Sequence, residues 1–481
     1  MNLSSTSPTN HQLNLTNLKQ GPIIFALILG AFVSLLNETL LGNALPVLMT
    51  ELNVTASTIQ WLTTAYMLVV GILVPITALL QQWFTTRQMF LSAMLTFLIG
   101  TIIAALSPSF FFLLIGRIIQ AFGTGLMLPL LMNTILIIYP SEKRGAAMGL
   151  VGLVMLFAPA IGPTLSGVII DSLEWRWLFY MVIPLTVISI LIAFKYLQNV
   201  TELKRPKVDY LSIILSTLGF GGIVYSFSAS GDLGWSDLKV LLAIIIGVLS
   251  LLFFTIRQLK IENPILDLRA FSFPMFTLPV VIMFIVMMTM FSTMALLPMF
   301  LQTVLLVTAF KSGLIMLPGS IISGIMGPIA GSLFDKYRAK SIIIPGIILV
   351  ALGVFLFTTL DKDTSVLQLI VMHSLLMLGI IFVMTSQTFG LNQLTPNLYP
   401  HGTAIFNTLS QVAGAIGTAL GISKMSSGTS AYMEESNHPS NPIEKINGLT
   451  SGFHDSFMMA LYLIVIALVV SLFIKDQKKK N

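Results

Sequence analysis

The chain of 481 residues is 56% apolar and only 9% charged, whereas a soluble globular domain carries about 25% charged residues. A mean hydropathy of +0.93 further disfavours a soluble enzyme and predicts a polytopic membrane protein. The sequence has no cysteine, which excludes disulfide scaffolds, thiolate metal sites and cysteine nucleophiles.

The first 22 residues are polar and lack the pattern of a signal peptide, so we expect a short cytoplasmic tail. A helix needs about 20 mostly apolar residues to cross the hydrocarbon core of a bilayer. Fourteen stretches after the tail meet this requirement: 23–49, 58–82, 89–107, 110–138, 145–170, 177–197, 208–229, 239–256, 274–303, 312–333, 341–360, 365–391, 402–424 and 455–474.

The positions of the basic residues predict the orientation of these spans. With the N-terminus placed in the cytoplasm, 18 of the 25 lysines and arginines lie at inner segments and six at outer ones. The remaining one, Arg117, lies inside a span. Because cytoplasmic loops are enriched in Lys and Arg, and an even number of spans returns the chain to the same side, we expect both termini to be cytoplasmic.

Most connections are short, which leaves no room for a soluble catalytic domain. The seventh and eighth spans are expected to flank a short loop at 228–235. The longer connections are 198–207 and 257–273 on the inner side and 425–454 on the outer side. The last is rich in Ser, Asn and Glu, so we expect it to be an exposed extracellular loop.

Two distant segments resemble each other: 78–87 (ALLQQWFTTR), after the second span, and 331–340 (GSLFDKYRAK), after the tenth. Both follow an apolar helix and end in basic residues at the expected cytoplasmic face. Corresponding elements in two halves are typical of transporters built from repeated bundles, which hold their substrate near the middle of the membrane.

Five short motifs occur in order on the expected spans, and through them the chain resembles the 14-span drug:proton antiporter branch of the major facilitator superfamily. The motifs are 37–46 (NETLLGNALP), 60–66 (QWLTTAY), 116–125 (GRIIQAFGTG), 158–167 (APAIGPTLSG) and 175–177 (WRW).

The resemblance implies an all-helical fold of 14 transmembrane helices, with two six-helix bundles and two inserted helices. It divides the chain into a tail at 1–22, an N-terminal bundle at 23–197, linkers and inserted helices at 198–273, a C-terminal bundle at 274–474 and a basic tail at 475–481. It also implies a proton-coupled multidrug or antibiotic exporter in the cell membrane, driven by the proton gradient without a cofactor.

The chain departs from the family pattern at two places. The acidic residue of the first span is expected at position 37, where this chain has Asn37, and the carboxylate follows at Glu38. A shift of one residue rotates a helical side chain by about 100°. The carboxylate of Glu38 is therefore expected to point in a different direction from the acidic side chain of the family pattern. The loop after the second span has Gln82, Trp83 and Thr85 in place of the usual Gly, Asp and Arg.

Glu38 and Arg117 are the charged residues that lie deep within the expected spans. Charged groups inside a bilayer are costly and mark functional sites. Burial favours the protonated form of a carboxyl group, whereas a nearby guanidinium favours the ionised form. A site whose access to water and to Arg117 alternates would take up a proton outside and release it inside. The alternative is that the two residues form a static ion pair that holds two helices together.

Conformational roles are assigned to the glycines and the helix-kinking proline of the fifth span. They are also assigned to the loops after the second and tenth spans, which we call the gate loops. Small residues allow helices to approach closely in lipid, and a charge beside helix ends can pair in one state and not in the other. The assigned residues are Arg87, Gly162, Pro163, Gly167, Gly331, Asp335, Lys336 and Arg338.

A substrate cavity is expected to be lined by polar residues and by flexible methionines, which suit surfaces that accept varied ligands. The ninth span has methionines on one helical face, and the twelfth has a mixed polar face; plain packing is the alternative for both. His373 alone is expected to be a hydrogen-bonded structural residue, with a role in proton relay as the alternative. The assigned residues are Asn37, Asn43, Gln120, Met287, Met290, Met294, His373, Met377, Met384 and Gln387.

The sequence contains no phosphate-binding loop, no His-Glu-x-x-His motif and no spacing typical of a metal site. We therefore expect no enzyme activity, no metal, no nucleic-acid partner and no obligate protein partner. The expected partners are small hydrophobic or cationic drug-like molecules, protons and membrane lipid. Two alternatives stay open: export of an endogenous lipid, peptide or signalling metabolite by the same fold, and a membrane sensor or assembly factor that does not transport.

Overall fold

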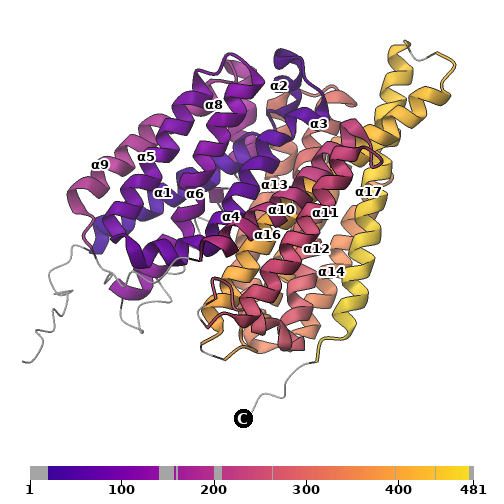
Figure 1. Ribbon diagram of the computed structural model, residues 1–481. Coiled ribbons are helices and arrows are strands. Elements are labelled where there is room, and N and C mark those ends of the chain that lie inside the picture. The colour runs from indigo at the N-terminus through magenta and orange to yellow at the C-terminus, as the bar shows by residue number, and fades with distance from the viewer. Residues whose placement is uncertain are drawn as a thin grey trace, which may run out of the picture.

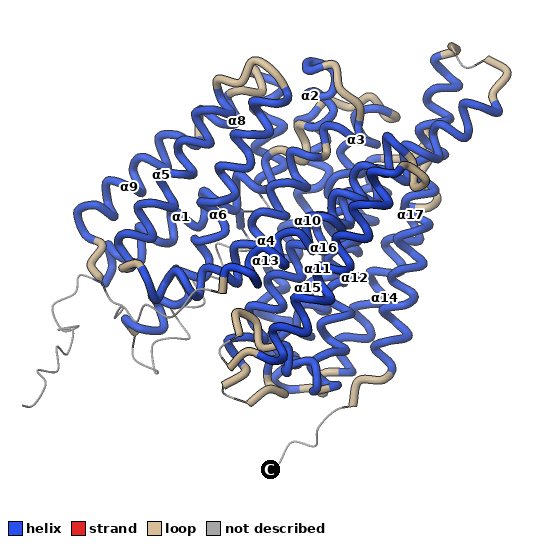
Figure 2. Tube along the Cα trace, in the orientation of Figure 1, coloured by secondary structure: helices blue, strands red, loops and turns tan. Residues whose placement is uncertain are grey.

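The computed structural model describes residues 20–139, 157–158, 161–199, 209–262, 264–395, 397–438 and 440–475, and within these ranges the regular elements are helices (Figures 1 and 2). The first half consists of α1 (Gln20–Leu40), α2 (Leu45–Leu52), α3 (Ala56–Ile59), α4 (Trp61–Trp83), α5 (Thr86–Ala105), α6 (Phe110–Ile138), an unlabelled helical segment at 161–172, α8 (Trp177–Tyr180) and α9 (Val182–Tyr196).

Two long helices and a short one lead into the second half: α10 (Tyr210–Leu233), α11 (Leu238–Lys260) and the 3-10 helix η2 (Leu268–Ser272). The second half consists of α12 (Pro274–Thr303), α13 (Ala309–Lys336), α14 (Lys340–Phe357), α15 (Val366–Leu391), α16 (Tyr399–Glu435) and α17 (Pro442–Leu472).

Thirteen of the described helices are long and apolar enough to cross a membrane. A helix satisfies its own backbone hydrogen bonds, which is the requirement for crossing lipid. Most of the expected fifth span, 145–170, lies outside the described residues, and its part from 161 onward is helical. The all-helical architecture is confirmed, while the count of 14 stays a prediction.

The two halves have separate apolar cores. Buried side chains of residues 23–197 form two large clusters, one with Phe90 and the other with Trp175. Another, including Phe300 and Phe457, is built almost wholly from 254–474. Figure 1 shows the helices of the two halves converging near α2 and α3 and leaning apart toward the opposite end.

Both described chain ends lie at the end where the helices lean apart. Helix α1 leads from Gln20 up to α2, and α17 descends toward the C-terminus at the bottom of Figure 1. We call the end with α2, α3 and the start of α13 the outer end, and the end with Gln20 and Lys475 the inner end. These names follow the orientation expected from the basic residues.

The start of α5 explains part of the unusual gate loop. Thr85 accepts a hydrogen bond from the backbone N–H of Gln88, and the Gln88 side chain accepts one from the backbone N–H of Thr85. This capping box satisfies donors that the helix start leaves open. Thr85, where the family pattern differs, therefore has a clear local structural role.

Helices α10 and α11 pack against each other through glycines. A side-chain carbon added at Gly222 would lie 2.7 Å from the Ala243 carbonyl oxygen, so the close approach requires glycine. The expected loop at 228–235 is wrong in its first part, because α10 continues to Leu233. The turn begins at Gly234, whose φ of +80° favours glycine.

The segment 425–454 is not the irregular loop that we expected, while its extracellular position stays a prediction. Helix α16 continues to Glu435 and α17 begins at Pro442, so most of the segment is a helical hairpin that projects from the outer end in Figure 1. The hydroxyl of Tyr432 donates to Glu444 at 3.1 Å and ties the two helices together. The polar composition reflects the exposure of this hairpin and not a lack of regular structure.

Candidate functional site

Glu38 lies in the last turn of α1, with 8% of its surface exposed. The Gln411 side chain of α16 is within hydrogen-bonding reach of its carboxyl group. Helix α1 belongs to the first half and α16 to the second. The deep carboxyl group therefore lies at the interface between the two halves.

Arg117, on α6, is completely buried. Its Nε donates to the Leu62 carbonyl oxygen at 3.2 Å, and one terminal nitrogen donates to the Asn37 carbonyl oxygen at 3.2 Å and to Gln120 Oε1 at 3.1 Å. The guanidinium also lies over the ring of Tyr66, 3.9 Å from its centre. These contacts hold the cation within the first half.

In the part of the chain that the structure describes, Arg117 and Glu38 form no ion pair, because the four salt bridges lie elsewhere. The second terminal nitrogen of Arg117, Nη2, has no hydrogen-bond partner among the described residues. The two charges belong to one polar cluster but are separately held. This arrangement does not match the static ion pair that the sequence left open.

Two residues assigned to the cavity instead support Arg117. Gln120 is completely buried, and its amide nitrogen donates to Thr101 Oγ1 at 2.9 Å while its oxygen accepts from Arg117. Asn37 is 1% exposed and contributes its backbone carbonyl to Arg117. In this conformation both are part of a buried network and not of an open wall.

Asn43 joins the two halves at the outer end. Its side-chain nitrogen donates to the carbonyl oxygens of Pro163, at 3.1 Å, and Ala309, at 2.7 Å. Gln302 Nε2 in turn donates to the backbone and side-chain oxygens of Asn43, both at 3.0 Å. Asn43 was assigned to the cavity, but here it is the centre of a closed contact.

The helical segment at 161–172 extends this contact. Thr164 Oγ1 donates to the Gly313 carbonyl at 3.1 Å, and Asp171 accepts from the backbone N–H of Phe310 at 3.0 Å. A side-chain carbon at Gly167 would collide with the backbone of Ala309. Pro163 and Gly167 therefore lie where the two halves meet, whereas a side-chain carbon at Gly162 would collide with Thr39 of the same half. We call the contacts between the halves, with those of Asn43, the outer seam.

The gate residues at the inner end contact their own half. Arg87 donates to the Phe194 carbonyl at 2.6 Å, and the Lys336 amine lies 5.5 Å from the centre of the Tyr337 ring. Arg338 is exposed, and a carbon added at Gly331 would meet nothing within 4 Å. The Asp335 side chain, like the residues 1–19 and most of the C-terminal tail, lies outside what the structure describes.

The cavity assignments on α12 and α15 have mixed burial. Met287 and Met377 are buried, and the others are half-buried: Met290, Met294, Met384 and Gln387. The expectation that His373 is hydrogen-bonded is wrong. Neither of its ring nitrogens has a partner among the described residues, and its ring packs against Gly319 of α13, where a side chain would collide with it.

Sequence reasoning missed Gln411, Gln302 and Tyr66. The two glutamines interrupt apolar spans, which is a detectable signal for a buried polar contact. Tyr66 lies in the second-span motif, and its hydroxyl forms a 2.6 Å hydrogen bond with Thr124 Oγ1. What the sequence does not reveal is which helix each of these residues faces.

A family model for the Major Facilitator Superfamily matches residues 27–418. The chain is 50% identical over 458 residues to the lincomycin resistance protein LmrB of Listeria innocua, covering 95% of this chain and 97% of that protein. It is 49% identical over 460 residues to the protein of the same name from Bacillus subtilis, covering 95% and 96%.

Solved structures agree on the fold. A POT family transporter in complex with 5-aminolevulinic acid matches with a TM-score of 0.69 and 15% identity, over 94% of this chain and 96% of that one. The xylose transporter XylE from Escherichia coli, in a partially occluded inward-open conformation, matches with a TM-score of 0.63 and 13% identity, over 96% and 99%.

Proposed function

Since this chain belongs to the major facilitator superfamily, we propose that it exports hydrophobic antibiotics from the cell in exchange for protons. It is a multi-pass protein of the cell membrane and a transporter, not an enzyme. Lincomycin-type antibiotics are the first substrates to test, because the relatives at about half identity are named for resistance to lincomycin. Other small hydrophobic or cationic drugs are the wider class.

The observation that carries the proposal is the position of Glu38 between the two halves. Proton coupling requires a group that gains and loses a proton in different conformations, and a carboxyl group at a moving interface changes its surroundings with every cycle. Arg117 stays with the first half, while Gln411 belongs to the second. Relative motion of the halves therefore changes the partners of Glu38.

The outer seam supports an alternating-access cycle. We propose that the described conformation is closed at the outer end, through Asn43 and its contacts with Pro163 and Ala309. Drug would enter from the inner end, and the two bundles would rock about the middle of the membrane. Breaking the seam would expose the drug to the outside, and protonation of Glu38 would favour its release and the return of the carrier.

Two six-helix bundles, 23–197 and 274–474, would be the rocking units, with α10 and α11 as inserted helices. No cofactor is needed in this scheme. The membrane potential contributes about 2.3 kcal/mol per charge per 100 mV. If one proton exchanged for one monovalent cation, no net charge would move and the pH gradient alone would drive export.

The direct test is proton release coupled to lincomycin uptake in proteoliposomes with an imposed pH gradient. We expect the wild-type protein to move both lincomycin and protons. Glu38→Gln is expected to fold but to lose concentrative transport of lincomycin. Glu434→Gln is the matched control, because Glu434 is an exposed carboxylate on the outer hairpin. Undiminished active transport by Glu38→Gln would disprove the role of this residue in coupling.

A susceptibility panel in a host without its own pumps tests the substrate class. Expression of the wild-type chain is expected to raise resistance to lincomycin, and Glu38→Gln is expected to abolish the gain. If no drug is exported but drug-independent proton movement is found, the cargo is an endogenous lipid, peptide or metabolite instead.

A further inference from the structure

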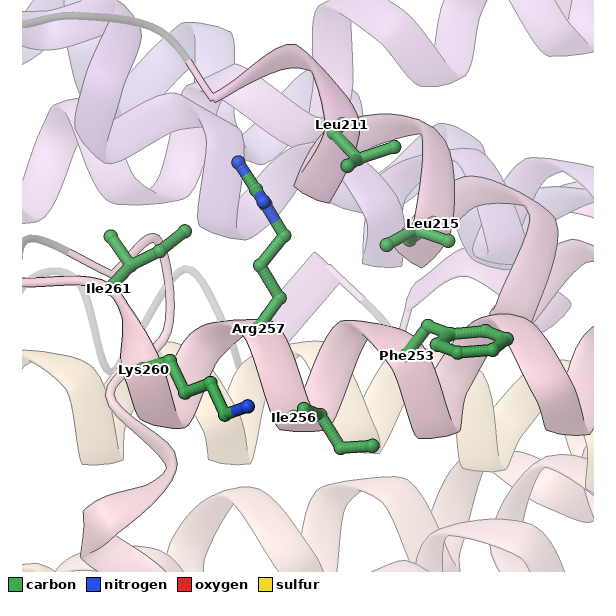
Figure 3. Close-up of a pocket in the computed structure, with 7 residues that line it drawn as sticks. All are labelled: Leu211, Leu215, Phe253, Ile256, Arg257, Lys260 and Ile261. Atoms are coloured by element: carbon green, nitrogen blue, oxygen red, sulfur yellow. The ribbon is translucent and has the colours of Figure 1, made fainter.

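A groove lies on the surface between α10 and α11, at the inner end (Figure 3). Its volume is about 440 Å³, within the range of about 300–1,000 Å³ typical of small-molecule sites. The residues that line it are Leu211, Leu215, Phe253, Ile256, Arg257, Lys260 and Ile261. It lies far in sequence from Glu38 and has no part in the transport scheme above.

Away from Lys260, the groove is lined by apolar side chains that are exposed on the protein surface. Leu211 is 49% exposed, Phe253 57% and Ile256 42%. Since α10 and α11 are membrane-spanning helices, such side chains face lipid chains. Figure 3 shows Leu215 and Phe253 on opposite helices at the end of the groove away from Lys260.

The inner end of the groove is basic. Arg257 reaches from α11 toward α10 and donates to both carboxylate oxygens of Asp209, at 2.9–3.1 Å. These bonds use Nε and Nη2 and leave Nη1 for another acceptor. Lys260, one turn further along α11, is exposed and has no ion-pair partner among the described residues.

The charged side chains at the groove, Arg257, Lys260 and Asp209, sum to one net positive charge, and the exposed Glu262, two residues beyond Lys260, does not line the groove. Asp209 neutralises Arg257 and fixes its direction, while Lys260 remains uncompensated. Both cations lie in the last turn of α11, where the basic residues place the cytoplasmic face of the membrane. The inner leaflet carries anionic lipids, and a basic pocket between spanning helices on that side attracts their headgroups.

We propose that this groove binds an anionic phospholipid of the cytoplasmic leaflet. Lys260 and the free nitrogen of Arg257 hold the phosphate, and Leu211, Phe253 and Ile256 contact an acyl chain. A zwitterionic lipid fits the apolar part equally well but brings an extra cation next to Lys260. The site therefore discriminates by headgroup charge, and a net charge of one corresponds to about a fivefold preference.

The test uses the full-length protein with a fluorescent probe in the groove. Phe253→Trp is reconstituted into vesicles containing brominated phosphatidylglycerol or brominated phosphatidylcholine, and the quenching is measured relative to the protein without the added tryptophan. We expect phosphatidylglycerol to quench the added tryptophan at about a fivefold lower mole fraction. Lys260→Gln in the same background is expected to remove this preference.

Lys239→Gln is the matched control, since Lys239 lies on the same helix at its outer start; it should keep the preference. Lipid adducts retained by protein with native Phe253, with and without Lys260→Gln, give a second readout by mass spectrometry if Phe253→Trp folds poorly. Equal quenching by the two lipids, or a preference that survives Lys260→Gln, would overturn the proposal.

Discussion

The guanidinium of Arg117 donates a hydrogen bond to the backbone carbonyl of Asn37, the residue that directly precedes Glu38. The cation is thus fixed to the helix that carries the acidic group without pairing with its carboxylate. The bonds to Leu62 and Gln120 and the ring of Tyr66 complete its surroundings. Arg117 is therefore held in place by neutral groups, and Glu38 is left able to change partners.

This arrangement predicts the stability of variants at the two positions. Arg117→Ala should destabilise the protein by about 3 kcal/mol, because it removes charge-assisted hydrogen bonds and leaves buried carbonyl oxygens without a donor. Glu38→Gln should change the stability little. Melting curves of the purified single variants and the double variant measure both effects.

The double variant separates the two models of the pair. If Arg117 and Glu38 were a static ion pair, removing both charges would restore most of the stability, since neither charge is left stranded. The structure predicts no such rescue, because the partners of Arg117 are backbone and neutral groups. A double variant as stable as wild type would contradict this account.

Gln411 is predicted to position Glu38 from the other half. Gln411→Ala should reduce the rate of proton-coupled export about tenfold, since a hydrogen bond to a charged group contributes about 1.5–3 kcal/mol and 1.4 kcal/mol is a factor of ten. Export rates in proteoliposomes at several pH values test this. Gln393→Ala, which alters an amide at the inner end of α15, should transport at the wild-type rate.

Asn43 is predicted to control opening at the outer end. Asn43→Ala removes the three hydrogen bonds of the outer seam that use the Asn43 side chain, each contributing about 1 kcal/mol. The population of the outward-open state should rise at least tenfold. Because the chain has no cysteine, a single Ser166→Cys, at the completely buried serine between the seam residues Thr164 and Gly167, is expected to report this opening by its labelling with a membrane-impermeant maleimide.

A second cysteine variant controls for the amount of protein and for the access of the maleimide to the outer face. Ser236→Cys, in the exposed outer turn between α10 and α11, should react at the same rate with and without Asn43→Ala. If Ser166→Cys stays unreactive in the Asn43→Ala background, the seam does not depend on this residue.

The helices of the second half were largely predictable, because long apolar runs have clear ends. The stretch 274–303 coincides with α12, and 365–391 differs from α15 by one residue. The hairpin of α16 and α17 was missed because its surface is polar and the helix signal is weak where no lipid is contacted. There, contacts such as Tyr432 with Glu444 stabilise helices that hydropathy does not reveal.

The candidate site was predictable in its charges but not in its contacts. Glu38 and Arg117 stand out because charged groups in apolar spans are rare. Their separation depends on how α1 packs against α6, and the position of Glu38 near Gln411 depends on the packing of helices more than 300 positions apart in the chain. Asn43 shows the same limit, since a polar residue at a helix end fits both a cavity wall and a closed seam.

The gate loops give a prediction that the sequence alone supports. Asp335→Asn should slow the transport cycle more than Gln82→Ala does, because the second loop keeps its acidic residue beside Lys336 and Arg338. A carboxylate near helix ends can accept hydrogen bonds in one state and lose them in another. Equal rates for Asp335→Asn and wild type would show that the gate does not need this charge.

Asp209 predicts a pH dependence of stability at the inner end. Burial acts to raise the pKa of its carboxyl group, but hydrogen bonds from Arg257 and Ser212 outweigh it and hold the pKa below the ordinary value. The unfolded chain has a pKa of about 3.9 at this residue. Since the folded value is lower, the ionised form stabilises the fold above the unfolded value, and this contribution is lost as the pH falls through the folded one.

Asp209→Asn should therefore lower the melting temperature at pH 7, and the difference from wild type should shrink as the pH falls below about 4. The effect is tempered by water, because 39% of the Arg257 side chain is exposed. Glu262→Gln, an exposed carboxylate beyond the end of α11, should show no such convergence. A melting difference for Asp209→Asn that stays constant from pH 7 to pH 3 would mean that Asp209 acts through contacts that asparagine cannot make at any pH, and not through its charge.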